Sequence, residues 1–427
     1  MESAEGEQWG TAMDEELARL REMVTWELTK DMLEGRMPIG NRWVFMKKKD
    51  KHGNTIQYKA QLVAQGFSQK PGTDYSNNSM FVPVMRFESL CTAFGMAAIN
   101  GWDMRQMDIN TAYLNGYLEE EIYMLQPSGF DDRTGRICRL RQSLYGLKQA
   151  GNVWNKAWNK AMEELGYKKL KSDYCCFVWR KGEDFSILLV WVDDLINFSN
   201  DTDRVEQKLK TKFEINVIRE PSILLGMKID HDEEKKIISL SQTHYIDSLL
   251  ERFGLMNANM VSTPMDPNVN LDEEEDEGRD TDERGPETYA TAIGLLMYAA
   301  LATRPDIAYA VQQLAQFTKN PWLKHWTAVK RVFRYLKGTR THTLMYGGSD
   351  QSWTTELTFF CDADWASNAD RKSTSGYVIL FAGEAIAWSA KKQSTIALSM
   401  AKAEYIVATH KESQEFLTCA QHSSAVP

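Results

Sequence analysis

Two adjacent aspartates, Asp193 and Asp194, interrupt an apolar stretch over residues 186–199 (SILLVWVDDLINFS). The apolar runs on either side predict a tight hairpin of two buried strands with the aspartates at its tip. Neighbouring carboxylates in an apolar setting repel each other and lose hydration, so the pair is unfavourable without a cation. Taken alone, the pair has a simpler explanation, because Asp is common in ordinary hairpin turns.

A third carboxylate, Asp108, favours a metal site over a plain turn. It lies in a short strand expected within residues 104–116, and a long helix expected over 142–165 separates that strand from the hairpin. A strand–helix–hairpin order can set the two strands side by side, so that their carboxylates converge. Oxygen ligands of this kind suit two Mg²⁺ ions, whose coordination shells substrate phosphates would complete.

Composition limits the class of protein. The chain has 427 residues, 43% hydrophobic and 26% charged, which is typical of a soluble globular protein of two to four domains. The apolar stretches are too short to span a bilayer, and the acidic N-terminus lacks the apolar core of a secretory signal. Six scattered cysteines without ligand spacing predict reduced thiols. We therefore expect an intracellular protein that is not secreted and has no membrane partner.

Charge is distributed unevenly along the chain. The formal net charge is −9, but residues 271–287 (LDEEEDEGRDTDERGPE) contain ten acidic and two basic residues and account for most of it. The rest of the chain is close to neutral and contains basic runs such as Lys47-Lys48-Lys49. Local basic stripes are compatible with a nucleic-acid backbone as partner. For the lysine run itself, a solvated surface explains the pattern equally well.

Helix and strand patterns alternate without a regular βαβ order, which predicts an α+β fold. The acidic composition of 266–288 predicts a linker, because this stretch is too charged to pack. Expected helices lie at 12–24, 84–100, 142–165, 202–213, 289–337 and 394–417, and expected strand pairs at 42–67, 186–199 and 223–241.

Several sequence blocks follow one another in a recognisable order. They include QMDINTAYLNGYLEEEIYMLQPSGF (106–130), SLYGLKQA (143–150), WVDD (191–194) and CDADWASNADRKSTSGYV (361–378). In these blocks, and over nearly its whole length, the chain resembles the reverse transcriptase of copia-type LTR retrotransposons, a part of their Pol polyprotein.

The resemblance implies a right-hand polymerase with fingers, palm and thumb, followed by an incomplete ribonuclease H-like α/β domain. The implied divisions are an N-terminal helical segment (1–40), the fingers, palm and thumb (41–265), the acidic linker (266–288), a helical connection (289–345) and the truncated ribonuclease H-like domain (356–427).

The resemblance also implies roles for individual residues. Asp108, Asp193 and Asp194 would be the catalytic carboxylates that bind Mg²⁺ or Mn²⁺, with Asp194 the less direct ligand. Tyr113 would be a steric gate against ribose, with an ordinary core aromatic as the alternative. The other implied residues are Gln149 and Lys59 for the nucleotide, and Lys47, Lys48, Lys49, Lys148 and Trp191 for the nucleic acid.

The C-terminal stretch departs from the family pattern. Asp362 and Glu404 match the first two metal carboxylates of a ribonuclease H, whereas the tail 417–427 (LTCAQHSSAVP) contains no Asp or Glu. We therefore regard these two residues as vestigial and expect no ribonuclease H activity. Gln61 and Gln65 also stand where the family usually has Arg and Lys.

The resemblance thus implies an RNA-directed DNA polymerase that uses dNTPs and an RNA or DNA template–primer. Its other partners would be the Gag and Pol products of the element, in a cytoplasmic virus-like particle, with the nucleus as a second location. Two alternatives stay open: a non-catalytic relic that binds nucleic acid, and an inactive truncated fragment.

Overall fold

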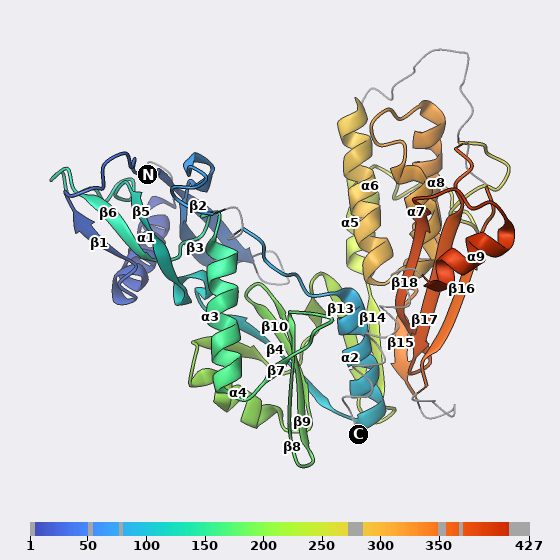
Figure 1. The fold of residues 1–427 in the computed structure, drawn as a ribbon, viewed down its shortest axis with the longest axis horizontal. Coiled ribbons are helices and arrows are strands. Elements are labelled where there is room, and N and C mark those ends of the chain that lie inside the picture. The colour runs from blue at the N-terminus through green and yellow to red at the C-terminus, as the bar shows by residue number, and fades with distance from the viewer. Residues whose placement is uncertain are drawn as a thin grey trace.

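A computed structural model describes residues 5–49, 54–76, 80–271, 285–348, 356–366 and 370–409 of the chain. The fold is α+β, as the sequence predicts, with helices and antiparallel sheets mixed along the chain (Figure 1). Among the described helices, none is long and apolar enough to cross a membrane.

The central element is a six-stranded sheet with the strand order β11-β4-β10-β9-β8-β7, in which every pair is antiparallel. Its strands β9 and β10 are rich in Ile, Leu, Val and Phe, which suit a sheet buried on both faces. The strands are β4 (Asp103–Ile109), β7 (Lys168–Lys169), β8 (Cys176–Lys181), β9 (Asp184–Trp191), β10 (Asp194–Ser199) and β11 (Ile215–Ile218).

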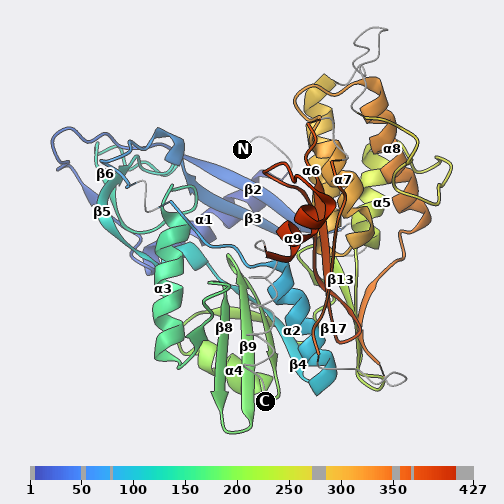
Figure 2. The ribbon, with the colours of Figure 1, turned by 45° about the vertical axis from the view of Figure 1, so that its right-hand side comes forward.

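Helices cover both faces of this sheet. On one face, α3 (Ala150–Glu164) and α4 (Thr202–Lys210) pack against side chains such as Leu188 and Leu195. On the other face, α2 (Phe87–Asn100) packs against the alternate set, which includes Leu189. Figure 2 shows the sheet between α3 and α2. The period of two along each strand assigns neighbouring residues to opposite faces.

Residues of α1 to β3, together with β5 and β6, form a separate cluster of elements around its own core. A three-stranded sheet has the order β1-β6-β5, and a long hairpin, β2–β3, packs against α1. The bounds are α1 (Gly6–Glu22), β1 (Trp26–Thr29), β2 (Asn41–Lys49), β3 (Thr55–Ala64), β5 (Tyr117–Met124) and β6 (Ile137–Gln142), with short 3₁₀ helices at Gly66–Ser68 and Ala112–Asn115.

The C-terminal part contains a helical bundle and two small sheets. The bundle has its own buried core, built from α5 (Thr243–Arg252), α6 (Gly285–Ala302), α7 (Ala308–Ala315) and α8 (Leu323–Gly338). The sheets have the orders β12-β13-β14-β15 and β16-β17-β18. Their strands are β12 (Ile223–Leu224), β13 (Met227–Asp232), β14 (Ile237–Ser241), β15 (Leu344–Gly347), β16 (Thr358–Ala363), β17 (Thr374–Phe381) and β18 (Glu384–Lys392), and α9 (Met400–Thr409) follows them.

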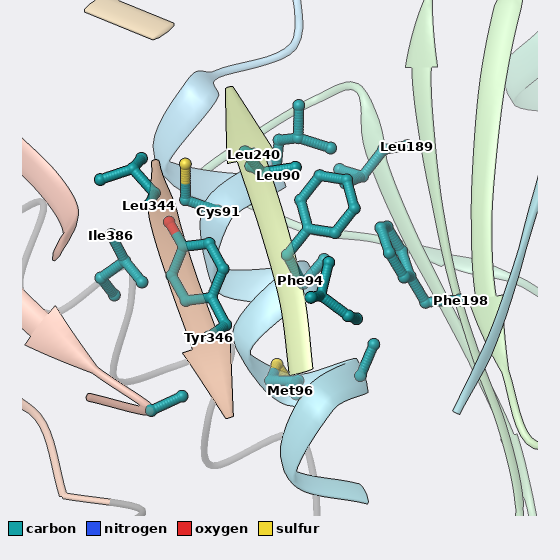
Figure 3. Close-up of a cluster of buried hydrophobic side chains, with 14 of the residues drawn as sticks. Leu90, Cys91, Phe94, Met96, Leu189, Phe198, Leu240, Leu344, Tyr346 and Ile386 are labelled. Carbon is teal, nitrogen blue, oxygen red and sulfur yellow. The ribbon is translucent and has the colours of Figure 1, made fainter. Parts of the chain in front are cut away.

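Helix α2 joins the central sheet to the two C-terminal sheets, because it is apolar on all sides and buried from Ser89 to Ala98. Figure 3 shows its Phe94 beside Phe198 of β10, while Cys91 lies near Tyr346 of β15. The rings of Phe94 and Phe198 meet edge to face, with centroids 5.0 Å apart. The Tyr346 hydroxyl donates to the carbonyl of Ala385 in β18 at 2.8 Å. A helix that is hydrophobic all round belongs in the interior, so α2 is a layer shared by three sheets.

Candidate functional site

The register of the central sheet brings the predicted carboxylates together. Strand β10 lies between β9 and β4, and Asp194 at its start is the direct cross-strand partner of Asp108 near the end of β4. Residues directly opposite in an antiparallel pair place their side chains on the same face. Asp193 immediately precedes Asp194 and occupies the turn of the β9–β10 hairpin. All three side chains are half-buried at one end of the sheet.

The hairpin turn has an unusual backbone. Val192 has a φ of +62°, whereas Asp193 is not among the residues with positive φ. A two-residue turn with positive φ at its first central position alone is of type II′. A β-branched residue in the left-handed region is rare and unfavourable, so the surrounding contacts must hold Val192 there.

Burial and mutual repulsion shape the electrostatics of the site. Burial raises the pKa of Asp193, and the negative charge of Asp108 raises this pKa further, while the positive charge of Lys59 opposes both effects. The pKa of Asp194 is raised by burial and by the charges of Asp193 and Asp108. The site therefore has an excess of negative charge in a partly desolvated setting.

Such a donor set fits a hard divalent cation, because carboxylate oxygens are the ligands that Mg²⁺ and Mn²⁺ prefer and a cation would relieve the repulsion. Within the described residues, however, no group of three or more His, Cys, Asp or Glu side chains could hold a metal ion by itself. Oxygens from a substrate would have to complete the coordination shell. Mg²⁺ commonly binds in this way, through one or two carboxylates and substrate phosphates.

Two tyrosines border the carboxylates. Tyr113 lies in the 3₁₀ helix just after β4, and its ring meets that of Tyr145 edge to face, with centroids 4.7 Å apart at 83°. Burial raises the pKa of Tyr113, and the charge of Asp193 contributes in the same direction. Burial likewise raises the pKa of Tyr145, again with a contribution from Asp193. The pair thus forms a half-buried aromatic wall beside Asp193.

Of the predicted basic residues, Lys59 is close enough for its charge to act on Asp193. It projects from β3, opposite Met46 of β2, and its charge also acts on Glu16 of α1. Glu16 is buried and accepts a hydrogen bond from the Leu62 amide at 3.3 Å. Glu16 was not predicted from the sequence, since a lone Glu on an amphipathic helix carries no signal.

Lys47 contacts residues other than the three carboxylates. Its ammonium pairs with Glu5 at 2.6 Å and lies 5.5 Å from the centre of the Tyr58 ring. Lys48 is exposed on the same strand, and Lys49 is the last residue of β2. Lys148 is exposed just before α3.

Gln149 lies inside the protein rather than on an open surface, with an exposed fraction of 0%. Its amide oxygen accepts from Gln69 at 3.0 Å, and its amide nitrogen donates to the carbonyl of Asp74 at 2.9 Å. A nucleotide could reach it directly only by displacing these partners. Trp191 is half-buried opposite Asp194 in the hairpin and packs near Phe87, with ring centroids 6.2 Å apart.

Asp362 and Glu404 come from neighbouring elements of the C-terminal part. Asp362 is exposed on β16, and Glu404 on α9 accepts a hydrogen bond from the amide of Ala363 at 3.3 Å. Asp362 and Asp364 both line a cavity of about 480 Å³. The tail 417–427, on which the ribonuclease H expectation depends, lies outside the described residues, as does 272–284 of the acidic stretch.

Comparison with known proteins identifies the lineage. A family model described as reverse transcriptase (RNA-dependent DNA polymerase) matches residues 23–267. The retrovirus-related Pol polyprotein from transposon TNT 1-94 of Nicotiana tabacum is 40% identical over 411 residues, which cover 93% of this chain and 30% of that protein. The putative transposon Ty5-1 protein of Saccharomyces cerevisiae is 31% identical over 310 residues, covering 71% of this chain and 98% of its own.

A solved structure of a foamy viral protease–reverse transcriptase in complex with double-stranded DNA aligns with 97% of this chain and 61% of its own. Its TM-score is 0.47 and its sequence identity 9%. The chain spans under a third of the tobacco polyprotein. On the family match and these relatives, the chain belongs to the reverse transcriptases of copia-type retrotransposon Pol polyproteins.

Proposed function

We propose that this chain is an RNA-directed DNA polymerase that adds dNTPs to the 3′-hydroxyl of a primer. The observation that carries the proposal is the register of Asp194 against Asp108, with Asp193 in the adjoining turn. This arrangement gathers three carboxylates, and burial together with the neighbouring negative charges raises the pKa of Asp193 and of Asp194.

Asp108 and Asp193 would hold the divalent cations, Mg²⁺ or Mn²⁺, and Asp194 would support them. When bound, such cations lower the pKa of the primer hydroxyl and stabilise the charge of the departing pyrophosphate. The protein needs little covalent chemistry of its own, so its contribution is to fix the carboxylates and align the reactants.

The residues around the carboxylates would bind the nucleotide. Lys59 would neutralise part of the triphosphate, since its charge already reaches Asp193. The Tyr113 ring, held edge-on by Tyr145, would leave no room for a ribose 2′-hydroxyl. Gln149 would act indirectly, because its hydrogen bonds fix the start of α3.

Template and primer would be bound chiefly through backbone charge, because a polymerase must accept any sequence. Trp191 would lie near the primer terminus, and exposed Lys48 and Lys148 would face phosphates together with Lys47 and Lys49. For Lys47 this requires exchange of its Glu5 partner for a phosphate.

In this proposal, residues 41–265 form fingers, palm and thumb, with the central sheet as the palm. Residues 1–40 are an N-terminal helical segment, 266–288 a linker, 289–345 a connection and 356–427 a ribonuclease H-like domain. Other Gag and Pol products of the element would be its partners in a cytoplasmic virus-like particle.

The test is incorporation of dTTP on poly(rA)–oligo(dT) with Mg²⁺ by purified residues 1–427. The matched control is the double variant Asp193→Asn, Asp194→Asn, which removes charge with little change in shape. We expect incorporation by the wild type and none by the variant. A folded, monodisperse wild-type protein that incorporates nothing would overturn the proposal and leave either a binding relic or an inactive fragment.

A further inference from the structure

Both peptide groups that flank Asp193 are fixed by hydrogen bonds from other elements. The carbonyl of Val192, in the peptide before Asp193, accepts the indole N–H of Trp154 in α3 at 2.7 Å. The carbonyl of Asp193, in the peptide after it, accepts the amide of Ile109 in β4 at 3.0 Å. Because the two peptide planes set φ and ψ of Asp193, these two bonds fix the direction of the Cα–Cβ bond from which its carboxylate extends.

The bond from Trp154 selects one of two turn geometries. Types II′ and I′ share a positive φ at the first central residue and differ by a flip of the central peptide, here Val192–Asp193. In type I′, Asp193 would itself take a positive φ, which Asp tolerates well. An indole that binds the Val192 carbonyl holds the peptide in the type II′ orientation that the structure has.

The indole is itself held rigidly. Trp154 is only 3% exposed, and its ring packs against Trp158 and Phe213 with centroid distances of 5.7 and 5.4 Å. A side chain packed on these faces cannot swing away from the turn without disturbing the layer between α3 and the sheet. Trp154 therefore transmits the position of α3 to the carboxylate turn.

We propose that Trp154 is a positioning residue that keeps the Val192–Asp193 peptide in the orientation that directs Asp193 toward Asp108. The consequence for catalysis rests on the proposed polymerase function, whereas the effect on the turn does not. Nothing in the sequence distinguishes this tryptophan from Trp158, one helical turn away.

The two tryptophans provide a matched pair of variants. Trp158 is as deeply buried and stacks on Phe213, yet its indole N–H has no hydrogen-bond partner among the described residues. Trp154→Phe removes the bond to the turn, and Trp158→Phe removes a similar volume from the same aromatic cluster. A sharper variant carries 3-benzothienylalanine at position 154, which keeps the shape of tryptophan and replaces its N–H by sulfur.

Three readouts apply to these proteins: kcat and KM for dTTP, Mn²⁺ affinity from water-proton relaxation, and hydrogen exchange of the Trp154 indole in the wild type. We expect a slowly exchanging indole, and a kcat about 10- to 100-fold lower in both position-154 variants, with the KM for dTTP little changed. Mn²⁺ affinity should fall in the same two variants, and Trp158→Phe should behave as the wild type.

The positioning role would be overturned if the benzothienylalanine protein had the kcat and Mn²⁺ affinity of the wild type. It would also be overturned if Trp158→Phe lowered kcat and Mn²⁺ affinity as much as the position-154 variants do. A fast-exchanging Trp154 indole would overturn it as well. If the wild type fails to polymerise, the proposed function fails, and Mn²⁺ affinity and indole exchange still decide the inference.

Discussion

Asp108 and Asp194 face each other directly across the antiparallel strands β4 and β10. Like charges in such a pair are unfavourable, and here burial and the neighbouring Asp193 add to the effect. A bound cation would relieve this repulsion, and the proposed function requires such a cation.

Removing one of these charges should stabilise the metal-free protein. The pKa of Asp194 is raised in the folded state, so folding becomes less favourable as pH rises from the ordinary carboxyl pKa through the raised one. Asp194→Asn should abolish this loss and raise the free energy of unfolding at pH 7 by about 0.5 kcal/mol. Thermal unfolding in EDTA between pH 4 and pH 8 measures both effects.

Asp203→Asn is the control for this experiment, because the hydrogen bond from Arg105 lowers the pKa of Asp203. The Asp203→Asn substitution should lower the free energy of unfolding slightly or not at all. A lower melting temperature for Asp194→Asn in EDTA at neutral pH would show that the carboxylates do not repel.

Tyr113 should decide between deoxyribose and ribose substrates. Tyr113→Val removes the ring beside Asp193, and we expect discrimination against ribonucleotides to fall about 100-fold. The measurement is the ratio of kcat/KM for dTTP and UTP. Tyr113→Phe keeps the ring and its edge contact with Tyr145, so it should discriminate like the wild type. Unchanged exclusion of UTP by Tyr113→Val would assign the gate to another side chain.

Gln149 should matter for stability before it matters for nucleotide binding. Gln149→Met leaves the buried side-chain amide of Gln69 and the carbonyl of Asp74 without their partner. We expect the free energy of unfolding to fall by roughly 2 kcal/mol in urea titrations. Lys148→Met, at the exposed neighbouring position, should leave stability unchanged. A raised KM for dTTP in Gln149→Met without loss of stability would instead indicate direct contact with the nucleotide.

Arg105 should stabilise the protein from the face of β4 opposite to that of Asp108. It is buried and donates to Asp203 at 2.8 Å and to buried Glu206 at 2.7 Å, tying α4 to the strand that carries Asp108. Arg105→Met should lower the free energy of unfolding by about 1–3 kcal/mol, since Glu206 retains Lys210 at 2.6 Å. Urea unfolding at pH 7 measures the loss.

The effect of Arg105 should depend on pH. Hydrogen bonding to Lys210 and the nearby positive charges lower the pKa of Glu206, so the stabilisation is present above the ordinary Glu pKa and disappears as pH falls through the lowered one. The difference in the free energy of unfolding between wild type and Arg105→Met should therefore become smaller as the pH falls. Lys156→Met removes an exposed pair with Glu119 and should have little effect at any pH. A loss in Arg105→Met no larger than in Lys156→Met would contradict the role of Arg105.

Local signals in the sequence predicted most helices and the hairpins β2–β3, β9–β10 and β13–β14, but not the strands β1, β5, β6 and β8. The apolar runs around Asp193 and Asp194 predicted the β9–β10 hairpin, and the helix expected over 84–100 corresponds to α2 at Phe87–Asn100. These features depend on side-chain periodicity and turn chemistry within a few residues. The family, too, was predicted from the order of sequence blocks and is confirmed by the match over residues 23–267.

Contacts between distant segments could not be predicted from the sequence. The strand pair expected at 223–241 is part of a four-stranded sheet, because β15 pairs with β14. The basic run did not indicate that Lys47 pairs with Glu5. The helical pattern around Gln149 did not indicate that this residue is buried. Such contacts depend on which surfaces meet when the whole chain collapses.

The sequence by itself thus determined most helices, several hairpins, the lineage and the residue types at the site, since periodicity and motif order are local properties. Only the tertiary structure decided that Asp108 stands opposite Asp194 and that Trp154, rather than Trp158, binds the turn. The physical reason is that strand register and helix placement follow from burying apolar faces on both sides of one sheet. A shift of one residue would carry Asp108 to the opposite face.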